Sequence, residues 1–353
     1  MLANVLYGFL ALFVFAVIFA AAYRGYRQGV NRAAIALKSP PGVQTARFVK
    51  IGGIEQWISI RGEDVAKPVL LLLHGGPGNA MSALTYNVLR PLEAHFTVAQ
   101  WDQRGAGKTY GLHGKAGAGE MSIDRMVRDG IEVAEWLKAD LQKDKVILVG
   151  LSWGSLLGTE MVKRRPDLFS AYVGTGQVVD MKRGEAVAYD ALKERLRLRG
   201  DPKEIAALEA IGPPPYPTRK ALIAERRLLF KTASAADRAI LRQMPMTLLT
   251  SPGLSLKGAW DALLSASNLF SIDVLYDALM DYDIRRLGTR FEIPMIYLQG
   301  ADDIQTPTVL VEAYFAEIEA PEKALVLLGD GAAHMAMVTH VDAFLAALVE
   351  KVG

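Results

Sequence analysis

From residue 43 onward, short apolar runs alternate with longer amphipathic stretches. The apolar runs, each predicted as a strand, lie at residues 48–51, 54–60, 69–73, 96–101, 146–149, 171–174, 295–298 and 324–328. The first two flank Gly52-Gly53 and predict a hairpin. The stretches Ile123–Leu141 and Leu156–Arg165 have apolar residues at helical spacing. Strands of this kind alternating with helices predict an α/β fold, with a mostly parallel sheet and helices on both faces.

Residues 180–290 interrupt this alternation. Their pattern is largely helical, with a proline-rich break at Gly212–Pro217. An insertion between two strands, placed over the carboxyl ends of a parallel sheet, is typical of a lid. We therefore expect a helical cap at 180–290, inserted between two parts of an α/β core at 43–179 and 291–353.

The N-terminus has a different pattern. No charged residue occurs from Leu2 to Tyr23, and a helix of this length reaches about 33 Å, enough to cross a hydrocarbon core. The sequence predicts a transmembrane anchor at 2–23 and a linker at 24–42. A signal peptide is the alternative, because Ala20–Ala22 resembles a cleavage site. However, no Lys or Arg precedes the apolar run, as a signal peptide normally requires.

Basic residues follow the apolar run instead, at Arg24, Arg27, Arg32 and Lys38. By the positive-inside rule, they place the rest of the chain on the cytoplasmic side. The pattern thus favours a retained single-pass membrane protein with a cytoplasmic catalytic domain. The alternative is a protein secreted after cleavage of a signal peptide.

Charge and composition exclude several classes of function. The chain has 40 basic and 38 acidic side chains, a net charge of +2, and no long basic run outside the N-terminal region. This balance gives no reason to expect a nucleic-acid partner. Because the chain contains no cysteine, disulfides, thiolate nucleophiles and cysteine-ligated metals are excluded.

The strongest chemical motif is Gly-Leu-Ser-Trp-Gly at Gly150–Gly154. It follows a predicted strand and precedes a helical pattern, which is the context of a nucleophile elbow. A side chain at either glycine would collide with the backbone of so sharp a turn. Ser152 is therefore expected to lie exposed above the sheet as the nucleophile.

A nucleophilic serine needs a base and an acid that orients the base. Of the five histidines, His334 follows the last predicted strand, where the chain order Ser, Asp, His places the base. Two carboxylates, Asp302 and Asp303, follow the strand before it. We prefer Asp303 and keep Asp302 as the alternative.

An oxyanion hole requires two donors already in place. The first expected donor is the backbone N–H of Trp153, directly after the nucleophile. The second should come from the glycine-rich turn after the strand at 69–73, where we select Gly76; its neighbour Gly75 lets the backbone approach a ligand.

Together these motifs resemble the prolyl iminopeptidase family, serine peptidases of the α/β-hydrolase fold. The resemblance lies in His-Gly-Gly-Pro-Gly at 74–78, Trp-Asp-Gln-Arg-Gly-Ala-Gly at 101–107 and Gly-Leu-Ser-Trp-Gly-Ser at 150–155. It continues in the acid loop, where Pro307 follows Asp303, and at His334. The resemblance covers about residues 45–350.

The resemblance implies an aminopeptidase that releases an N-terminal residue, often proline, through an acyl-enzyme. Asp102 and Arg104 would shape the floor of the site. Family peptidases hold the substrate amine with cap carboxylates, and the sequence does not identify these residues here. The mechanism needs no metal or organic cofactor. The alternatives are a membrane-anchored carboxylesterase or lipase-like hydrolase and a catalytically silent binding protein on the same fold.

Overall fold

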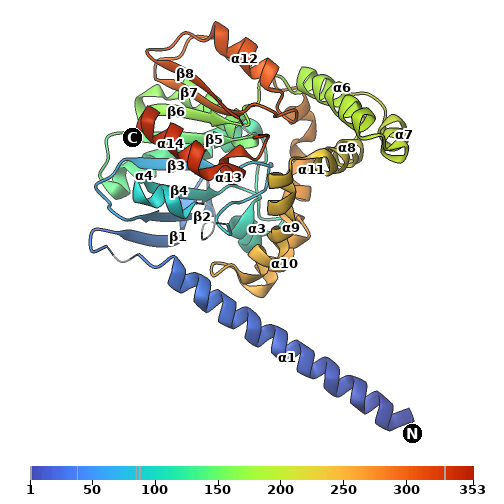
Figure 1. The fold of residues 1–353 in the computed structure, drawn as a ribbon. Helices are drawn as coiled ribbons and strands as arrows, with labels where there is room; N and C mark the ends of the chain where they lie inside the picture. Colours follow the sequence, from blue (N-terminus) through green and yellow to red (C-terminus); the bar gives the residue numbers. More distant parts are fainter. Residues whose placement is uncertain (1, 38, 85, 87–88, 330) are drawn as a thin grey trace.

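The computed structural model describes residues 2–37, 39–84, 86, 89–329 and 331–353. Its centre is an eight-stranded sheet in the order β1-β2-β4-β3-β5-β6-β7-β8 (Figure 1). The strands are β1 (Val43–Ile51), β2 (Ile54–Gly62), β3 (Val69–Leu73), β4 (Thr97–Asp102), β5 (Val146–Leu151), β6 (Phe169–Thr175), β7 (Met295–Gly300) and β8 (Lys323–Leu328). β2 pairs antiparallel with β1 and β4, and all other neighbours are parallel. The α/β fold with a mostly parallel sheet is thus confirmed.

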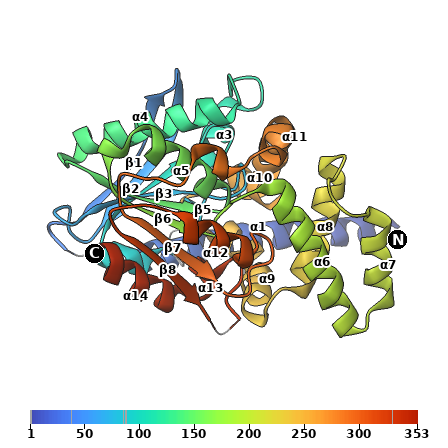
Figure 2. The same cartoon turned by 90° about the horizontal axis from the view of Figure 1, so that it is seen from above.

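Helices cover both faces of the sheet (Figure 2). The core helices are η1 (Arg90–Ala94), α3 (Gly107–His113), α4 (Ile123–Leu141), α5 (Trp153–Arg164), η2 (Pro166–Leu168), α12 (Thr308–Glu317), α13 (Ala336–Thr339) and α14 (Val341–Val352). Successive side chains of β3 point to opposite faces of the sheet and so pack in two different clusters of the core. Leu71 packs in the cluster that contains α4 and α5, and Leu70 packs in the cluster that contains η1 and α14. This alternation explains why these strands are apolar at every position.

The predicted strands all occur, and α4 has the predicted bounds. Ser122 caps α4 by accepting a hydrogen bond from the Arg125 N–H, and Gln142 ends it in the left-handed conformation. β1 begins earlier than predicted, at Val43. Its first residues are mostly exposed, so they lack the apolar run on which the prediction rested.

The helical cap lies over the carboxyl ends of the strands (Figure 1). It consists of α6 (Met181–Arg199), α7 (Pro202–Ile211), α8 (Arg219–Thr232), α9 (Ala235–Thr250), α10 (Leu256–Leu263), α11 (Ala266–Met280) and η3 (Ile284–Leu287). The proline-rich break separates α7 from α8. The two ends of the cap meet at the core: the Met181 N–H donates to the Tyr282 carbonyl, and the Ile284 N–H donates to the Val179 carbonyl. The cap is therefore an insertion closed at its base, between β6 and β7.

The N-terminal helix α1 (Leu2–Ala34) projects away from this body (Figure 1). Its segment Asn4–Ala34 is long and apolar enough to cross a membrane. The helix does not end at Tyr23, so the expectation of a linker from residue 24 is wrong for residues 24–34. Polar side chains attach this last part of α1 to the cap; the Asn31 amide, for example, donates to the Thr250 carbonyl over 3.0 Å.

Candidate active site

Ser152 lies in a sharp turn between β5 and α5. It has φ 52° and ψ −118°, a conformation that residues other than glycine rarely adopt and that costs energy. A Cβ on Gly150 would lie 2.7 Å from the Gly154 carbonyl oxygen, and a Cβ on Gly154 would lie 2.2 Å from that of Leu73. Both glycines are therefore required, as the sequence indicated, and the turn holds Ser152 at the carboxyl edge of the sheet.

A chain of hydrogen bonds connects Ser152, His334 and Asp303. The Ser152 hydroxyl lies 3.0 Å from Nε2 of His334, and Nδ1 of His334 lies 2.9 Å from a carboxylate oxygen of Asp303. Because a carboxylate only accepts, Nδ1 carries the imidazole proton and Nε2 accepts from the serine. Asp303 follows β7 and His334 follows β8, so parallel strands bring three distant segments to one edge.

The structure brings Asp303, and not Asp302, to the imidazole. Asp303 is buried and Asp302 is exposed. Burial by itself would raise the pKa of Asp303, but His334 and the hydroxyl and N–H of Thr306 hold it below its usual value. The N–H of Gln305 adds a bond of 2.8 Å. Asp303 is thus held as an ionised carboxylate facing the ring.

Of the two expected oxyanion donors, Trp153 follows Ser152 directly, and Gly76 belongs to the loop whose Gly75 approaches Ser152. Trp153 is the first residue of α5, where helical N–H groups have no partner within the helix. On the other side, a Cβ on Gly75 would lie 3.4 Å from Cβ of Ser152. Gly76 has φ +125°, which requires glycine.

His74 holds this glycine loop in place. Its Nδ1 lies 2.8 Å from the Gly75 carbonyl, and the Gln103 N–H donates to its Nε2 over 3.3 Å. Burial lowers the pKa of His74 to about 4, so the ring is neutral. The Gln103 side chain in turn accepts from the Trp153 indole over 2.9 Å. The three sequence motifs are therefore one connected structure around Ser152.

Asp102 and Arg104, the residues expected to shape the floor of the site, form hydrogen bonds with other parts of the fold. The Asp102 carboxylate accepts from the Lys108 N–H at the start of α3. The Arg104 guanidinium bonds Asp129 of α4 and the carbonyls of Gly52 and Ala118. These hydrogen-bond partners of Arg104 thus lie in the β1–β2 hairpin, in α4 and in the loop between α3 and α4. Its side chain therefore braces these elements, and the expected role of Asp102 and Arg104 in shaping the floor of the site stays a prediction.

We expect the replacement of Asp102 by asparagine to change how the free energy of unfolding depends on pH. Burial raises the pKa of Asp102 from 3.8 to about 6, against the bond from Lys108. Because the folded value is the higher one, the protonated group stabilises the fold at low pH, and this contribution is lost as pH rises from about 4 through 6. The free energy of unfolding of the wild type relative to Asp102→Asn should fall by roughly 3 kcal/mol over that range.

Denaturant unfolding at several pH values measures this difference. His74 titrates in the same range with the opposite sign, because its pKa is lowered, but it is present in both proteins and cancels. A difference that does not vary with pH between 4 and 7 would contradict the buried, raised carboxyl.

Sequence reasoning missed three residues that contact His334 or Asp303. The Thr306 hydroxyl donates to Asp303 over 2.7 Å and lies 3.2 Å from Nδ1 of His334. The Gln299 amide donates to Asp303 over 3.0 Å. A Cβ on Gly176 would lie 2.9 Å from the His334 ring, so only glycine fits there. The nearness of Thr306 to Asp303 in the sequence was an available signal for one of the three.

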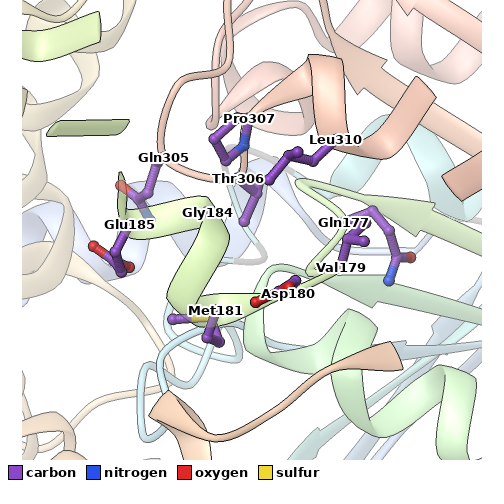
Figure 3. A pocket seen from close by; sticks show the side chains of 10 residues that line it. All are labelled: Gln177, Val179, Asp180, Met181, Gly184, Glu185, Gln305, Thr306, Pro307 and Leu310. Atoms are coloured by element: carbon purple, nitrogen blue, oxygen red, sulfur yellow. The ribbon is translucent and has the colours of Figure 1, made fainter. Parts of the chain in front are cut away.

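Two hollows lie between the cap and the acid loop. One is lined by Gln177, Glu185 and Gln305 among others (Figure 3). The second is lined by Asp303 and His334 from the core and by Asp237 of α9 from the cap. The hydrogen-bonded chain thus borders a space under the cap.

A metal centre is not apparent in the described ranges, since no three His, Asp or Glu side chains gather there as ligands. The chemistry that the arrangement offers is that of an activated hydroxyl with a base, an orienting carboxylate and nearby backbone donors.

Comparison with known proteins identifies the class. The sequence profile of the alpha/beta hydrolase fold matches residues 68–341. The chain therefore belongs to the α/β-hydrolase family, and we class it as a hydrolase.

Three individual proteins show which members of this family the chain resembles. The chain is 31% identical over 281 residues to "Probable aminopeptidase YbaC" of Bacillus subtilis (strain 168), covering 78% of this chain and 86% of the relative. A proline iminopeptidase structure from Mycobacterium smegmatis superposes with a TM-score of 0.61 at 19% identity, covering 87% of this chain and 97% of the other. A membrane phospholipase A structure has a TM-score of 0.57 at 16% identity and covers 99% of both chains. The resemblance to the prolyl iminopeptidases is thus confirmed at the level of the family.

Proposed function

We propose that the protein is a serine aminopeptidase that releases the N-terminal residue of a peptide, with Ser152 as nucleophile. The hydrogen-bonded chain from Ser152 through His334 to Asp303 carries this proposal. The aminopeptidase name of the relative at 31% identity supports the substrate class.

In the proposed reaction, Oγ of Ser152 attacks the carbonyl carbon of the first peptide bond while its proton passes to Nε2 of His334. Asp303 stabilises the imidazolium. The N–H groups of Trp153 and Gly76 stabilise the oxyanion. His334 then donates the proton to the departing amine, and the C–N bond breaks. A water activated by the same ring hydrolyses the acyl-enzyme and regenerates the serine.

Asp237 is our candidate for binding the substrate's free amine. It is a buried cap carboxylate that lines the same hollow as His334. Its Oδ1 has no hydrogen-bond partner among the described residues. The other buried cap carboxylates, Glu185 and Glu225, both pair with Arg226. Asp237 is therefore better placed to accept from an ammonium group.

The variant Asp237→Asn is expected to raise KM for substrates with a free N-terminus by about 10- to 100-fold, the effect of one hydrogen bond to a charged group. Esters without an amine should keep their KM. Steady-state kinetics on both substrate types measure this split. Asp190→Asn is the matched control, an exposed carboxylate on α6. Equal losses on amine and ester substrates would contradict the role of Asp237.

The substrate class is tested with the full chain in detergent. Proline and alanine amide reporters, with and without a blocked N-terminus, are compared with short acyl esters. We expect cleavage of the free amides that depends on Ser152 and is lost on blocking. Ester cleavage alone, indifferent to an amine, would contradict the aminopeptidase proposal. Absence of all turnover would favour a silent binding protein.

A membrane-anchored esterase acting on amphiphilic acyl substrates is the second candidate. The observation that favours it is α1, whose segment Asn4–Ala34 is apolar enough to span a membrane. The match to the membrane phospholipase A covers 99% of this chain, whereas the match to the proline iminopeptidase covers 87%. The same triad would serve both reactions. We also propose that α1 is retained as an anchor, with the catalytic domain on the cytoplasmic side.

A further inference from the structure

The helix α10 presents an apolar face to the outside of the cap. Leu256, Trp260 and Leu264 follow one another at every fourth position along α10 and its C-terminal cap, and their side chains are 61%, 58% and 58% exposed. Residues at this spacing lie on the same side of a helix. Ala259, by contrast, is fully buried against the body. Three large apolar side chains exposed together mark a contact surface.

The last part of α1 is fixed beside this face. The Arg24 guanidinium donates to the Leu254 carbonyl over 2.8 Å, and the Gln28 amide donates to the Ser251 carbonyl over 2.7 Å. These carbonyls belong to the turn that leads into α10. The views of the fold show α10 close to α1 (Figures 1 and 2).

These bonds also set the height of α10 along α1. The uncharged run of α1 ends at Tyr23, and Arg24 is its first charge. If the run fills the hydrocarbon core, Arg24 lies at the membrane surface. Its partner Leu254 is two residues before Leu256 in the chain. The exposed face of α10 therefore begins at the level where lipid tails give way to headgroups.

We propose that α10 docks its face of Leu256, Trp260 and Leu264 into the surface of the lipid bilayer that α1 crosses, an inference that rests on the proposed anchor. Tryptophan is enriched at this depth because its ring is apolar and its N–H is polar. Lys257 is exposed on the same helix, where its ammonium group pairs with Asp261 over 2.6 Å; in a docked state the ammonium can exchange this carboxylate for a lipid phosphate. The surface thus matches the chemistry of a membrane interface.

Docking would connect the bilayer to the proposed active site. The chain passes from α10 into α11, whose residues Ser267 and Asn268 donate to the carbonyls of Gly78 and Pro77. These carbonyls belong to the loop of Gly76, proposed as an oxyanion donor. The docked face and that loop are therefore joined by one turn, and amphiphilic substrates held in the bilayer would be close to the site.

Site-directed spin labelling of the full chain tests the docking. The chain has no cysteine, so Leu256→Cys and Leu264→Cys each give one labelling site. Val309→Cys is the water control, because Val309 is also 58% exposed and lies on α12, on the far side of the body from α1 (Figure 1). Phe15→Cys on α1 is the lipid control. In nanodiscs of neutral and anionic lipids, collision rates with oxygen and with a water-soluble nickel chelate report the depth of each label.

We expect the oxygen-to-nickel collision ratio at residues 256 and 264 to exceed that at residue 309 several-fold and to stay below that at residue 15, as an interfacial depth requires. Ratios at 256 and 264 equal to that at 309, with residue 15 in lipid, would overturn the docking and leave the anchor intact. A water-exposed residue 15 would overturn both. Labels at 256 and 264 shielded from both reagents would overturn the lipid assignment in favour of a second protein copy.

Discussion

Replacement of Ser152 by alanine is expected to lower kcat about a million-fold for any substrate that the protein turns over. This loss is typical when a serine nucleophile is removed from an intact triad. The hydroxyl is the atom that would form the acyl-enzyme, and the nearest base, Nε2 of His334, lies 3.0 Å away. Alanine keeps the Cβ and the backbone of the elbow, so the thermal unfolding temperature should stay close to that of the wild type.

Ser170→Ala is the matched control for this variant. Ser170 is an exposed serine near the start of β6, at the opposite end of the strand from the candidate site. Its activity should equal that of the wild type. A Ser152→Ala protein that is folded and retains more than a small fraction of the activity would show that another group performs the reaction.

The second large effect is expected from Asp303→Asn, which should lower kcat about 10⁴-fold at neutral pH, as in serine proteases. An asparagine amide can donate to Nδ1 of His334, which would move the ring proton to Nε2 and leave Ser152 without an acceptor. The negative charge that stabilises the imidazolium would also be lost. The backbone N–H groups of Gln305 and Thr306 donate to Oδ1 and can still be accepted by the amide oxygen. The Thr306 hydroxyl and the Gln299 amide, which donate to Oδ2, lose their acceptor in this orientation.

The neighbouring carboxylate provides the control. Asp302→Asn makes the same chemical change one residue away, at an exposed side chain, and kcat should stay within about twofold of the wild type, as expected for a surface substitution away from the reacting groups. Single-turnover kinetics on a reporter substrate separate the chemical step from binding. A larger loss from Asp302→Asn than from Asp303→Asn would reverse the assignment of the orienting acid.

The sequence was most informative where one local rule determines the structure. The strand Val69–Leu73 is buried on both faces and is apolar throughout, so its pattern alone predicted a central strand. The elbow at Gly150–Gly154 was equally clear, since steric exclusion of every side chain larger than hydrogen leaves two glycines in the sequence.

Features that depend on contacts between distant segments could not be predicted from a local sequence pattern. Asp302 and Asp303 are chemically identical, and only the three-dimensional loop determines which is buried against His334. Arg104 lies in a motif of the family, yet its ion pair with Asp129 of α4 could not be foreseen from that motif. Asp237 is separated from His334 in the chain by about half of the cap and part of the core, and no spacing rule connects them.

The extent of α1 was missed for a related reason. A charge pattern marks where an apolar run ends, but it does not mark where the helix ends, because the backbone bonds of a helix are internal. The side chains that fix the last part of α1, Gln28 and Asn31, bind the cap 223 and 219 residues further along the chain.

Covalent labelling of the full chain with a fluorophosphonate, followed by peptide mass spectrometry, tests the central claim most directly. The reagent reacts with a serine hydroxyl whose proton is taken by a neighbouring base. We expect one adduct per chain, located on Ser152, and much slower labelling of a His334→Ala variant. Absence of an adduct on Ser152 in the folded protein, or an adduct on a different serine, would contradict the assignment of Ser152 as the nucleophile.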